Sequence, residues 1–178
     1  MTTPDKSGKR LTWWNGLIFL LIAAAIVVLD QVSKQWINAN IPVGGALPEM
    51  GPLYIVNIQN TGSAFGLFPN QAFLLSVVAI AGLLVVLMFF RYFNELGFLG
   101  GIALSLIFAG ALGNLIDRLR VGSITDFIYV RLWGNFFWPA FNVADSAITV
   151  GAISLAVIAL LQLRKKDESK SKPGTKEV

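Results

Sequence analysis

The chain has 178 residues, of which 55% are hydrophobic and 13% are charged, and its formal net charge is +4. A soluble domain has about 25% charged residues, so the composition excludes an ordinary soluble protein, and the length predicts one domain over residues 1–178. The sequence has no Cys and no His, which excludes disulfides and leaves only carboxylates for a metal site. We therefore predict neither a metal nor a cofactor.

Four long stretches of the sequence contain no ionisable residue. A helix that crosses hydrocarbon needs roughly 20 mostly apolar residues, and each stretch supplies one. The predicted helices cover about residues 14–36, 72–90, 96–117 and 142–163. The predicted fold class is therefore an all-α polytopic membrane protein with four transmembrane helices, and this core occupies residues 13–163.

Polar tails flank the core. The apolar run after residues 1–12 is long enough to span a bilayer, so we expect a retained helix and not a cleaved signal peptide. Residues 164–178 have no core-forming content, which predicts a disordered tail. Because Lys and Arg concentrate in these tails, the positive-inside rule places both termini in the cytoplasm and both long loops outside. The same clustering indicates contact with membrane lipids and not with nucleic acid.

Two long loops lie between the helices on the outer side. The first, residues 38–70, contains the β-prone segment Leu53–Ile58 among prolines and glycines. About thirty irregular residues are too many for a simple connection, which indicates a functional platform. The second, residues 118–141, is rich in aromatic residues.

Polar residues recur inside the predicted helices. Asp30 and Lys34 are four residues apart, so they share a helix face. This spacing predicts an ion pair, and ionisable residues at such a depth are equally typical of a functional site. Asn114 and Arg118 share a face of the third helix. Arg118 fits a helix C-terminus, whereas Asn114 lies one turn deeper among apolar residues and requires a partner.

Asp126 and Asp145 lie on either side of the aromatic loop. Asn142 and Asp145 open the fourth helix, where an N-cap residue and a first-turn acid are also favoured for structural reasons. Two carboxylates at one membrane level share a proton, because they do not both ionise readily. The ionised one can then take a proton from water, and the protonated one can polarise a scissile carbonyl and protonate the leaving amine. The pair therefore indicates aspartic peptidase chemistry.

Three alternatives stay open at this point. A serine–lysine hydrolase would use Lys34 as its base, but the adjacent Ser33 points to another helix face, which leaves Ser63. A transporter or channel would spread its acids through the depth of the bilayer, whereas these acids gather near one surface. A structural subunit would use the polar residues only to pair helices.

Five segments resemble those of a known family. They are Asp30–Lys34, Asn60–Phe65, Gly110–Arg118, Asp126–Ile128 and Phe141–Ser146. In this order and within four helices, they resemble the lipoprotein signal peptidase family (signal peptidase II), which are aspartic peptidases of bacterial inner membranes. The Gly-Asn-x-x-Asp-Arg and Phe-Asn-x-Ala-Asp motifs are the most specific part of the resemblance.

The resemblance implies a reaction and a set of site residues. The reaction is cleavage of the signal peptide just before the diacylglyceryl-modified Cys of a prolipoprotein. Asp126 and Asp145 are implied as the catalytic dyad. The residues implied to line, support or brace the site are Asp30, Lys34, Asn60, Gly62, Asn114, Arg118 and Asn142. The family fold adds a small extracytoplasmic β-platform in the first loop and a mobile helical flap in the second. Ser63 departs from the Ala that is frequent in the family, which leaves its role open. We expect a monomer, although the glycine-rich helix faces also permit packing between monomers.

Overall fold

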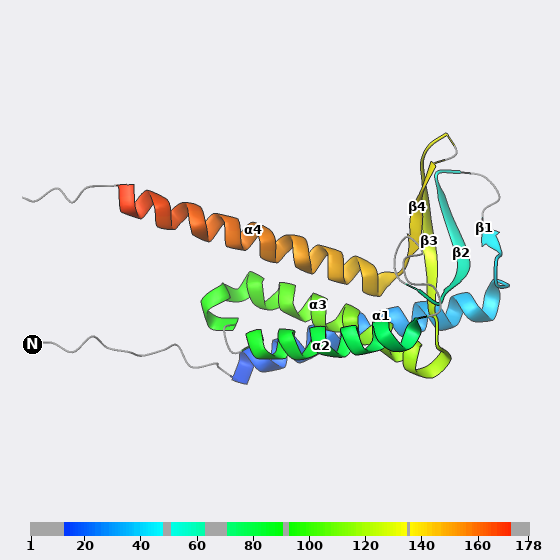
Figure 1. The fold of residues 1–178 in the computed structure, drawn as a ribbon, viewed down its shortest axis with the longest axis horizontal. Coiled ribbons are helices and arrows are strands. Elements are labelled where there is room, and N and C mark those ends of the chain that lie inside the picture. Colours follow the sequence, from blue (N-terminus) through cyan, green and yellow to red (C-terminus); the bar gives the residue numbers. More distant parts are fainter. Residues whose placement is uncertain (1–12, 48–50, 63–70, 91–92, 135, 172–178) are drawn as a thin grey trace, which may run out of the picture.

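A computed structural model describes residues 13–47, 51–62, 71–90, 93–134 and 136–171 (Figure 1). Long helices and a small sheet make up this part of the chain. The helices are α1 (Trp13–Asn40), α2 (Ala72–Phe90), α3 (Phe93–Val121) and α4 (Val143–Ser171), and the strands are β1 (Ala46–Leu47), β2 (Leu53–Asn60), β3 (Ile124–Trp133) and β4 (Phe136–Phe141). The fold confirms the prediction of four long apolar helices with a small β-platform.

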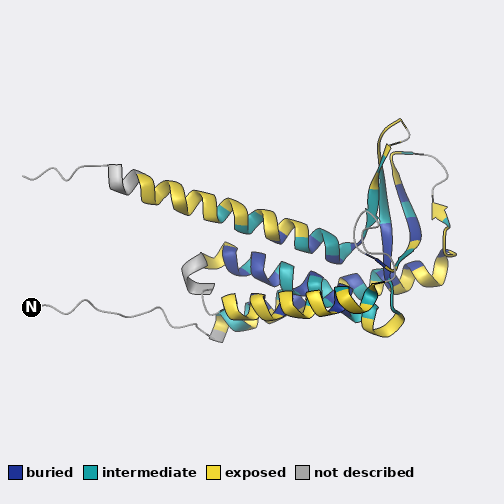
Figure 2. Ribbon diagram, in the orientation of Figure 1, coloured by how far each residue is buried: buried dark blue, intermediate teal, exposed yellow. Residues whose placement is uncertain are grey.

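Each of the four helices is long and apolar enough to cross a membrane. Apolar side chains cover their outer surfaces: Leu20 is 62% exposed on α1, Met88 64% on α2 and Leu160 62% on α4. Figure 2 shows the exposed residues along α2 and α4. Such faces are stable against hydrocarbon and not against water, so the chain is a multi-pass membrane protein.

Helix α3 is the central helix of the bundle, and it packs against α1, α2 and α4. Glycines permit the closest approaches. A Cβ on Gly110 would collide with the carbonyl oxygen of Ala144, and one on Gly113 would lie 2.7 Å from Oδ2 of Asp30. Small residues at such contacts are typical of helix packing in lipid, so part of the predicted glycine-rich face packs within the monomer.

The sheet lies at one end of the bundle, and its strands run across the helix axes (Figure 1). It is antiparallel with the order β1-β2-β3-β4. Its central pair places Ile58 opposite Asp126 and Asn60 opposite Ile124, with a register shift between Ile55 and Ile58. The beginning of α1 and the end of α4 lie at the other end of the bundle. The sheet therefore presents Asp126 where α3 ends and α4 begins.

Two regions differ from the prediction. Residues 164–171, expected to be a disordered tail, continue helix α4 to Ser171, because this stretch has neither Pro nor Gly to end the helix. The second outer loop was expected to form a flap of loop or helix, whereas residues 118–121 continue α3 and most of its other described residues form β3 and β4. The β-branched and aromatic run from Ile124 to Val130 favours a strand, and it completes the sheet that β2 begins.

Candidate active site

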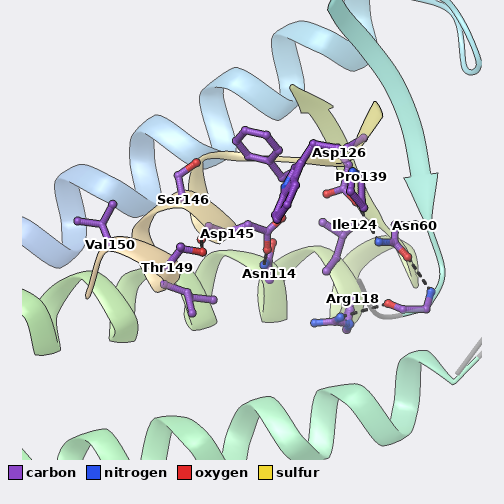
Figure 3. Close-up of a pocket in the computed structure, with 15 residues that line it drawn as sticks. Asn60, Asn114, Arg118, Ile124, Asp126, Pro139, Asp145, Ser146, Thr149 and Val150 are labelled. Atoms are coloured by element: carbon purple, nitrogen blue, oxygen red, sulfur yellow. Dashed lines mark hydrogen bonds between the residues drawn. The ribbon is translucent and has the colours of Figure 1, made fainter. Parts of the chain in front are cut away.

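A cavity of about 560 Å³ opens where the sheet meets α3 and α4 (Figure 3). Polar residues from four elements face it together with apolar ones. The lining residues are Asn60, Gly62, Asn114, Arg118, Ile124, Asp126, Trp138, Pro139, Ala140, Phe141, Asp145, Ser146, Ile148, Thr149 and Val150. The two acids singled out from the sequence therefore share one cavity, although 18 residues separate them in the chain.

Asp126 enters the cavity from strand β3, and only 3% of it is exposed. Its two carboxylate oxygens accept hydrogen bonds from two side-chain amides. Asn60 Nδ2 donates to Oδ2 at 2.9 Å, and Asn142 Nδ2 donates to Oδ1 at 2.7 Å. These donors orient the carboxylate while it remains at the cavity wall.

Asp145 enters the same cavity from the first turn of α4. Asn142 precedes this helix, and its Oδ1 accepts a hydrogen bond from the Asp145 backbone N at 2.9 Å. Asp145 Oδ2 in turn accepts from the Asn142 backbone N at 3.2 Å. This reciprocal pair is a capping box, so the capping role considered from the sequence is present. Capping uses only one oxygen of Asp145, because Oδ1 accepts from Asn114 Nδ2 at 2.8 Å.

Asn142 links the two acids. Its side-chain amide donates to Asp126, and its backbone N donates to Asp145. The side chain is fully buried at 0% exposure, which fixes its orientation. A single residue therefore sets the relative placement of both carboxylates.

The pKa of Asp126 is raised from 3.8 to about 6. Burial is the largest cause, since it disfavours the charged form, and the nearby negative charge of Asp145 acts in the same direction. The hydrogen bonds from Asn60 and Asn142 favour the charged form and limit the rise. An acid that binds its proton up to about pH 6 is suited to acid–base chemistry near neutrality.

A buried ionic cluster lies directly behind the acids. Lys34 is 3% exposed, and its Nζ lies 2.8 Å from Asp30 Oδ2 and 2.7 Å from Asp117 Oδ2. It also donates to Asn114 Oδ1 at 3.0 Å. The predicted ion pair between Asp30 and Lys34 is thus confirmed. Because Lys34 donates to the side-chain oxygen Oδ1 of Asn114, the side-chain nitrogen Nδ2 of Asn114 is directed at Asp145.

Asp30 also acts on helix α4. Its Oδ1 accepts a hydrogen bond from the backbone N of Ala144 at 2.9 Å. This nitrogen belongs to the first turn of α4, where backbone donors have no partner within the helix. A carboxylate from α1 therefore anchors the turn that carries Asp145.

Arg118 and Gly62 lie at the edge of the cavity. Arg118 Nη2 donates to the carbonyl oxygen of Gly62 at 3.4 Å, and the Gly62 backbone N donates to Asn60 Oδ1 at 3.0 Å. The guanidinium lies within electrostatic range of both Asp126 and Asp145. Every residue predicted for the site therefore lines the cavity or belongs to the cluster behind it, except Asn142, which is bonded to both acids.

Two residues of the ionic cluster were not selected from the sequence. Gln31 Nε2 donates to Asp117 Oδ1 at 2.8 Å and to the carbonyl oxygen of Gly113 at 3.2 Å. The second is Asp117, whose Oδ2 lies 2.7 Å from Lys34 Nζ. The available signal was that Lys34, already paired with Asp30, has capacity for a second acid from another helix.

The structure also bears on the serine–lysine alternative. Ser33 Oγ donates to the backbone carbonyl of Asp30 at 2.8 Å, which turns it away from a role as a nucleophile. Ser63 lies outside the described residues.

Buried paired acids at one cavity of a four-helix membrane protein define the class of membrane-embedded aspartic peptidases. The family described as Signal peptidase (SPase) II matches residues 22–161. The chain therefore belongs to the lipoprotein signal peptidase family.

Individual relatives agree with this assignment. A lipoprotein signal peptidase of Dehalococcoides mccartyi is 44% identical over 150 residues, covering 82% of this chain and 91% of the relative. One from Geobacter sulfurreducens is 39% identical over 153 residues, covering 84% and 95%. Two solved structures of a bacterial membrane enzyme, each 36% identical, superpose with TM-scores of 0.74 and 0.71. The first comparison covers 90% of this chain and 94% of the other, and the second covers 81% and 92%.

Proposed function

We propose that this protein removes the signal peptide from diacylglyceryl-modified bacterial prolipoproteins, cleaving just before the lipid-bearing Cys with water activated between Asp126 and Asp145. One observation carries the proposal: both carboxylates line one cavity, and Asn142 donates a hydrogen bond to each. The relatives named lipoprotein signal peptidase support the choice of substrate.

The proposed chemistry uses one shared proton. The ionised carboxylate takes a proton from water as the water oxygen attacks the scissile carbonyl carbon. The protonated carboxyl donates a hydrogen bond to the carbonyl oxygen, which stabilises the negative charge that develops there. When the C–N bond breaks, the leaving amine receives a proton from the dyad, and the signal peptide ends in a new carboxylate. The raised pKa of Asp126 is consistent with one retained proton.

The cavity walls support a substrate that carries acyl chains. Ile124, Phe141, Ile148 and Val150 give the cavity an apolar lining, and α4 continues this surface with exposed apolar residues such as Val150, which is 54% exposed. Acyl chains can therefore remain in hydrocarbon while the peptide bond reaches the carboxylates. Excluding water from the closed site would strengthen its electrostatic interactions.

The remaining predicted residues are assigned supporting roles. Asn60, Asn114 and Asn142 orient the carboxylates, and Asp30 and Lys34 brace them from behind. We assign Arg118 and the backbone of Gly62 to holding the substrate main chain, and their position at the edge of the cavity supports this role. No metal or cofactor takes part in this proposal.

The proposed orientation places the sheet and the dyad at the outer face of the bacterial inner membrane. The basic residues at both ends of the chain support this orientation through the positive-inside rule. The sheet lies opposite the beginning of α1 and the end of α4, as that topology requires.

The contacts of Lys34 favour the aspartic mechanism over serine–lysine catalysis. A lysine base must be neutral and near a hydroxyl. Lys34 instead contacts two carboxylates and one amide oxygen. The position of both acids at one end of the bundle likewise favours an enzyme over a transporter, whose acids would follow a path through the bilayer.

The test is cleavage of a diacylglyceryl-modified prolipoprotein by detergent-purified protein, comparing the wild type with Asp126→Asn and Asp145→Asn. We expect cleavage before the lipid-bearing Cys by the wild type alone, and persistence of that activity in the presence of metal chelators. Asp167→Asn is the matched control, because Asp167 is an exposed residue of α4. Cleavage by either dyad variant would overturn the proposed mechanism, and no cleavage by folded wild type would overturn the proposed function.

A further inference from the structure

A second hollow lies on the face of the sheet opposite the active-site cavity. Arg131 pairs with Phe137, and Val130 pairs with Trp138. Successive side chains on a strand point to opposite faces. Since Trp138 lines the active-site cavity, Arg131 and Phe137 point to the other face. The hollow there measures about 330 Å³ and is lined by Gly44, Gly45, Ala46, Tyr54, Val56, Ile58, Tyr129, Arg131 and Phe137.

Aromatic rings hold Arg131 in this hollow. Its guanidinium carbon lies 5.4 Å from the centre of the Tyr54 ring and 5.0 Å from that of Phe137. Phe137 in turn stacks on Tyr129, with ring centres 4.6 Å apart. Ring contacts hold the plane of a guanidinium and leave its N–H donors available at the edge. Neither ion pair found among the described residues involves Arg131. The hollow is therefore a pre-oriented positive site for an anion such as a phosphate.

The position of the hairpin formed by β3 and β4 indicates which kind of molecule would carry that phosphate. Residues next to Arg131 at the β3–β4 turn are large, apolar and exposed: Leu132 is 44% exposed, Trp133 69% and Phe136 49%. The rings of Trp133 and Phe136 stack at 4.9 Å. In Figure 1 β4 is the edge of the sheet nearest α4, and the β3–β4 turn extends past α4. With the helices across a membrane, this turn overhangs the lipid beside the bundle, at the level where Trp residues gather.

We propose that Arg131 and its ring clamp bind the phosphate of an anionic phospholipid in the leaflet at the sheet end, while Trp133 and Phe136 enter the interface. Complementary charge and the interfacial residues favour a lipid over a free anion. The site also bears on the dyad, because Asp126 and Arg131 belong to the same strand. A lipid bound at Arg131 thus fixes the strand that carries one of the two acids. This inference goes beyond the proposed function and is testable without peptidase activity.

The chain has no Cys, so a single introduced Cys can carry a fluorophore. We would label Leu132→Cys in nanodiscs containing phosphatidylglycerol and phosphatidylcholine, one of which is brominated on its acyl chains as a quencher. Val43→Cys serves as the matched label, because Val43 is 71% exposed and precedes β1, at the far edge of the sheet. We expect brominated lipid to quench the label at 132 and aqueous iodide to quench the label at 43. We also expect brominated phosphatidylglycerol to quench at 132 more strongly than brominated phosphatidylcholine.

Charge variants then test Arg131 itself. Arg131→Gln should reduce the preference for phosphatidylglycerol by about fivefold, the effect of one interfacial Arg. Arg120→Gln should preserve it, because Arg120 is exposed at the end of α3 outside the clamp. Quenching by brominated phosphatidylcholine verifies that the hairpin keeps its place in both variants. Iodide quenching at 132 without lipid quenching would overturn the proposal. It would also be overturned by equal effects of the two Arg variants, or by loss of the preference on adding soluble glycerol phosphate.

Discussion

Asp145 and Asp126 reach one cavity from two regions that are built differently. Asp145 belongs to the first turn of α4, which Asp30 and Lys34 anchor through buried ionic contacts. Asp126 belongs to a strand whose support consists of neutral amides from Asn60 and Asn142. In the helical region, the residues that position the acid also stabilise the fold. In the sheet region, these two roles fall more on different residues.

This difference predicts which substitutions will change catalysis and which will change the free energy of unfolding. Removing one partner of a buried ion pair leaves an uncompensated charge in a low dielectric, which costs several kcal/mol. Removing a neutral hydrogen-bond donor costs less, because no charge loses its counter-ion. Variants behind Asp145 should therefore lose the fold first, and variants around Asp126 should change catalysis first.

The largest effect on activity is expected from the substitution of either acid. Asp126→Asn and Asp145→Asn should each lower kcat/KM by at least about a thousandfold, because in the proposed mechanism each removes a group that accepts or donates the proton. Both should remain folded, since Asn keeps the shape of Asp and its Oδ1 can still accept one of the two hydrogen bonds that each carboxylate receives. Initial rates on a lipid-modified precursor, together with thermal unfolding of the same samples, measure the two effects. If the sheet variant retained activity and the helix variant did not, only Asp145 would be catalytic.

The next largest effect, on stability, is expected from a substitution that breaks the ionic cluster. Lys34→Met removes the only cation that contacts Asp30 and Asp117 in the described structure, and we expect a loss of about 3–5 kcal/mol in the free energy of unfolding. Unfolding by SDS in mixed micelles measures this loss. Lys34→Ala should still show measurable turnover in whatever fraction folds, because the proposed mechanism uses Lys34 to brace the site and not to react. Complete inactivity of a fully folded variant would favour the serine–lysine alternative.

Much of this organisation could be predicted from the sequence. The four helices follow from the gaps between ionisable residues, and the sharing of a face by Asp30 and Lys34 follows from their spacing. The contact between Asp30 and the backbone of Ala144 could not be predicted in the same way, because it joins residues 114 positions apart. Helix spacing reports neighbours on one helix, and it contains no information about which backbone group of another helix a carboxylate meets.

The sheet shows the same limit. The β propensity of Leu53–Ile58 predicted a strand, and the structure has β2 there. The aromatic second loop was predicted as a flap, and its described residues instead pair with β2 and with each other. Strand pairing depends on a partner that is distant in sequence, so the loop's own composition could not determine it.

The raised pKa of Asp126 predicts a pH dependence of stability. An unfolded chain releases this proton near pH 4, whereas the folded protein retains it up to about pH 6. The folded state therefore binds more protons in this window, and it loses up to about 3 kcal/mol of stability as the pH rises from about 4 to about 6. Asp126→Asn should remove that part of the slope. Unfolding measured at several pH values gives both curves, and identical slopes for the two proteins would show that Asp126 has an ordinary pKa when folded.

The smallest effects are expected from substituting the two asparagines whose side-chain amides donate to Asp126. Each hydrogen bond favours the ionised carboxylate, so Asn60→Ala and Asn142→Ala should each raise the pKa of Asp126 above about 6. The acidic limb of the pH profile of kcat/KM should then move to higher pH in both variants, because the mechanism requires one ionised carboxylate.

Stability should distinguish the same two variants. Only Asn142 also caps α4, through the hydrogen bond that its Oδ1 accepts from the Asp145 backbone N, and losing such a cap costs about 1 kcal/mol. Asn142→Ala should therefore shift the pH profile and lower the unfolding free energy, whereas Asn60→Ala should shift the profile alone. Equal destabilisation by the two substitutions would contradict the division between a helical region that supports the fold and a sheet region that tunes the acid. If instead the profile moved only in Asn142→Ala, the placement of the first turn of α4 would control both carboxylates, and the strand would merely deliver Asp126 to that turn.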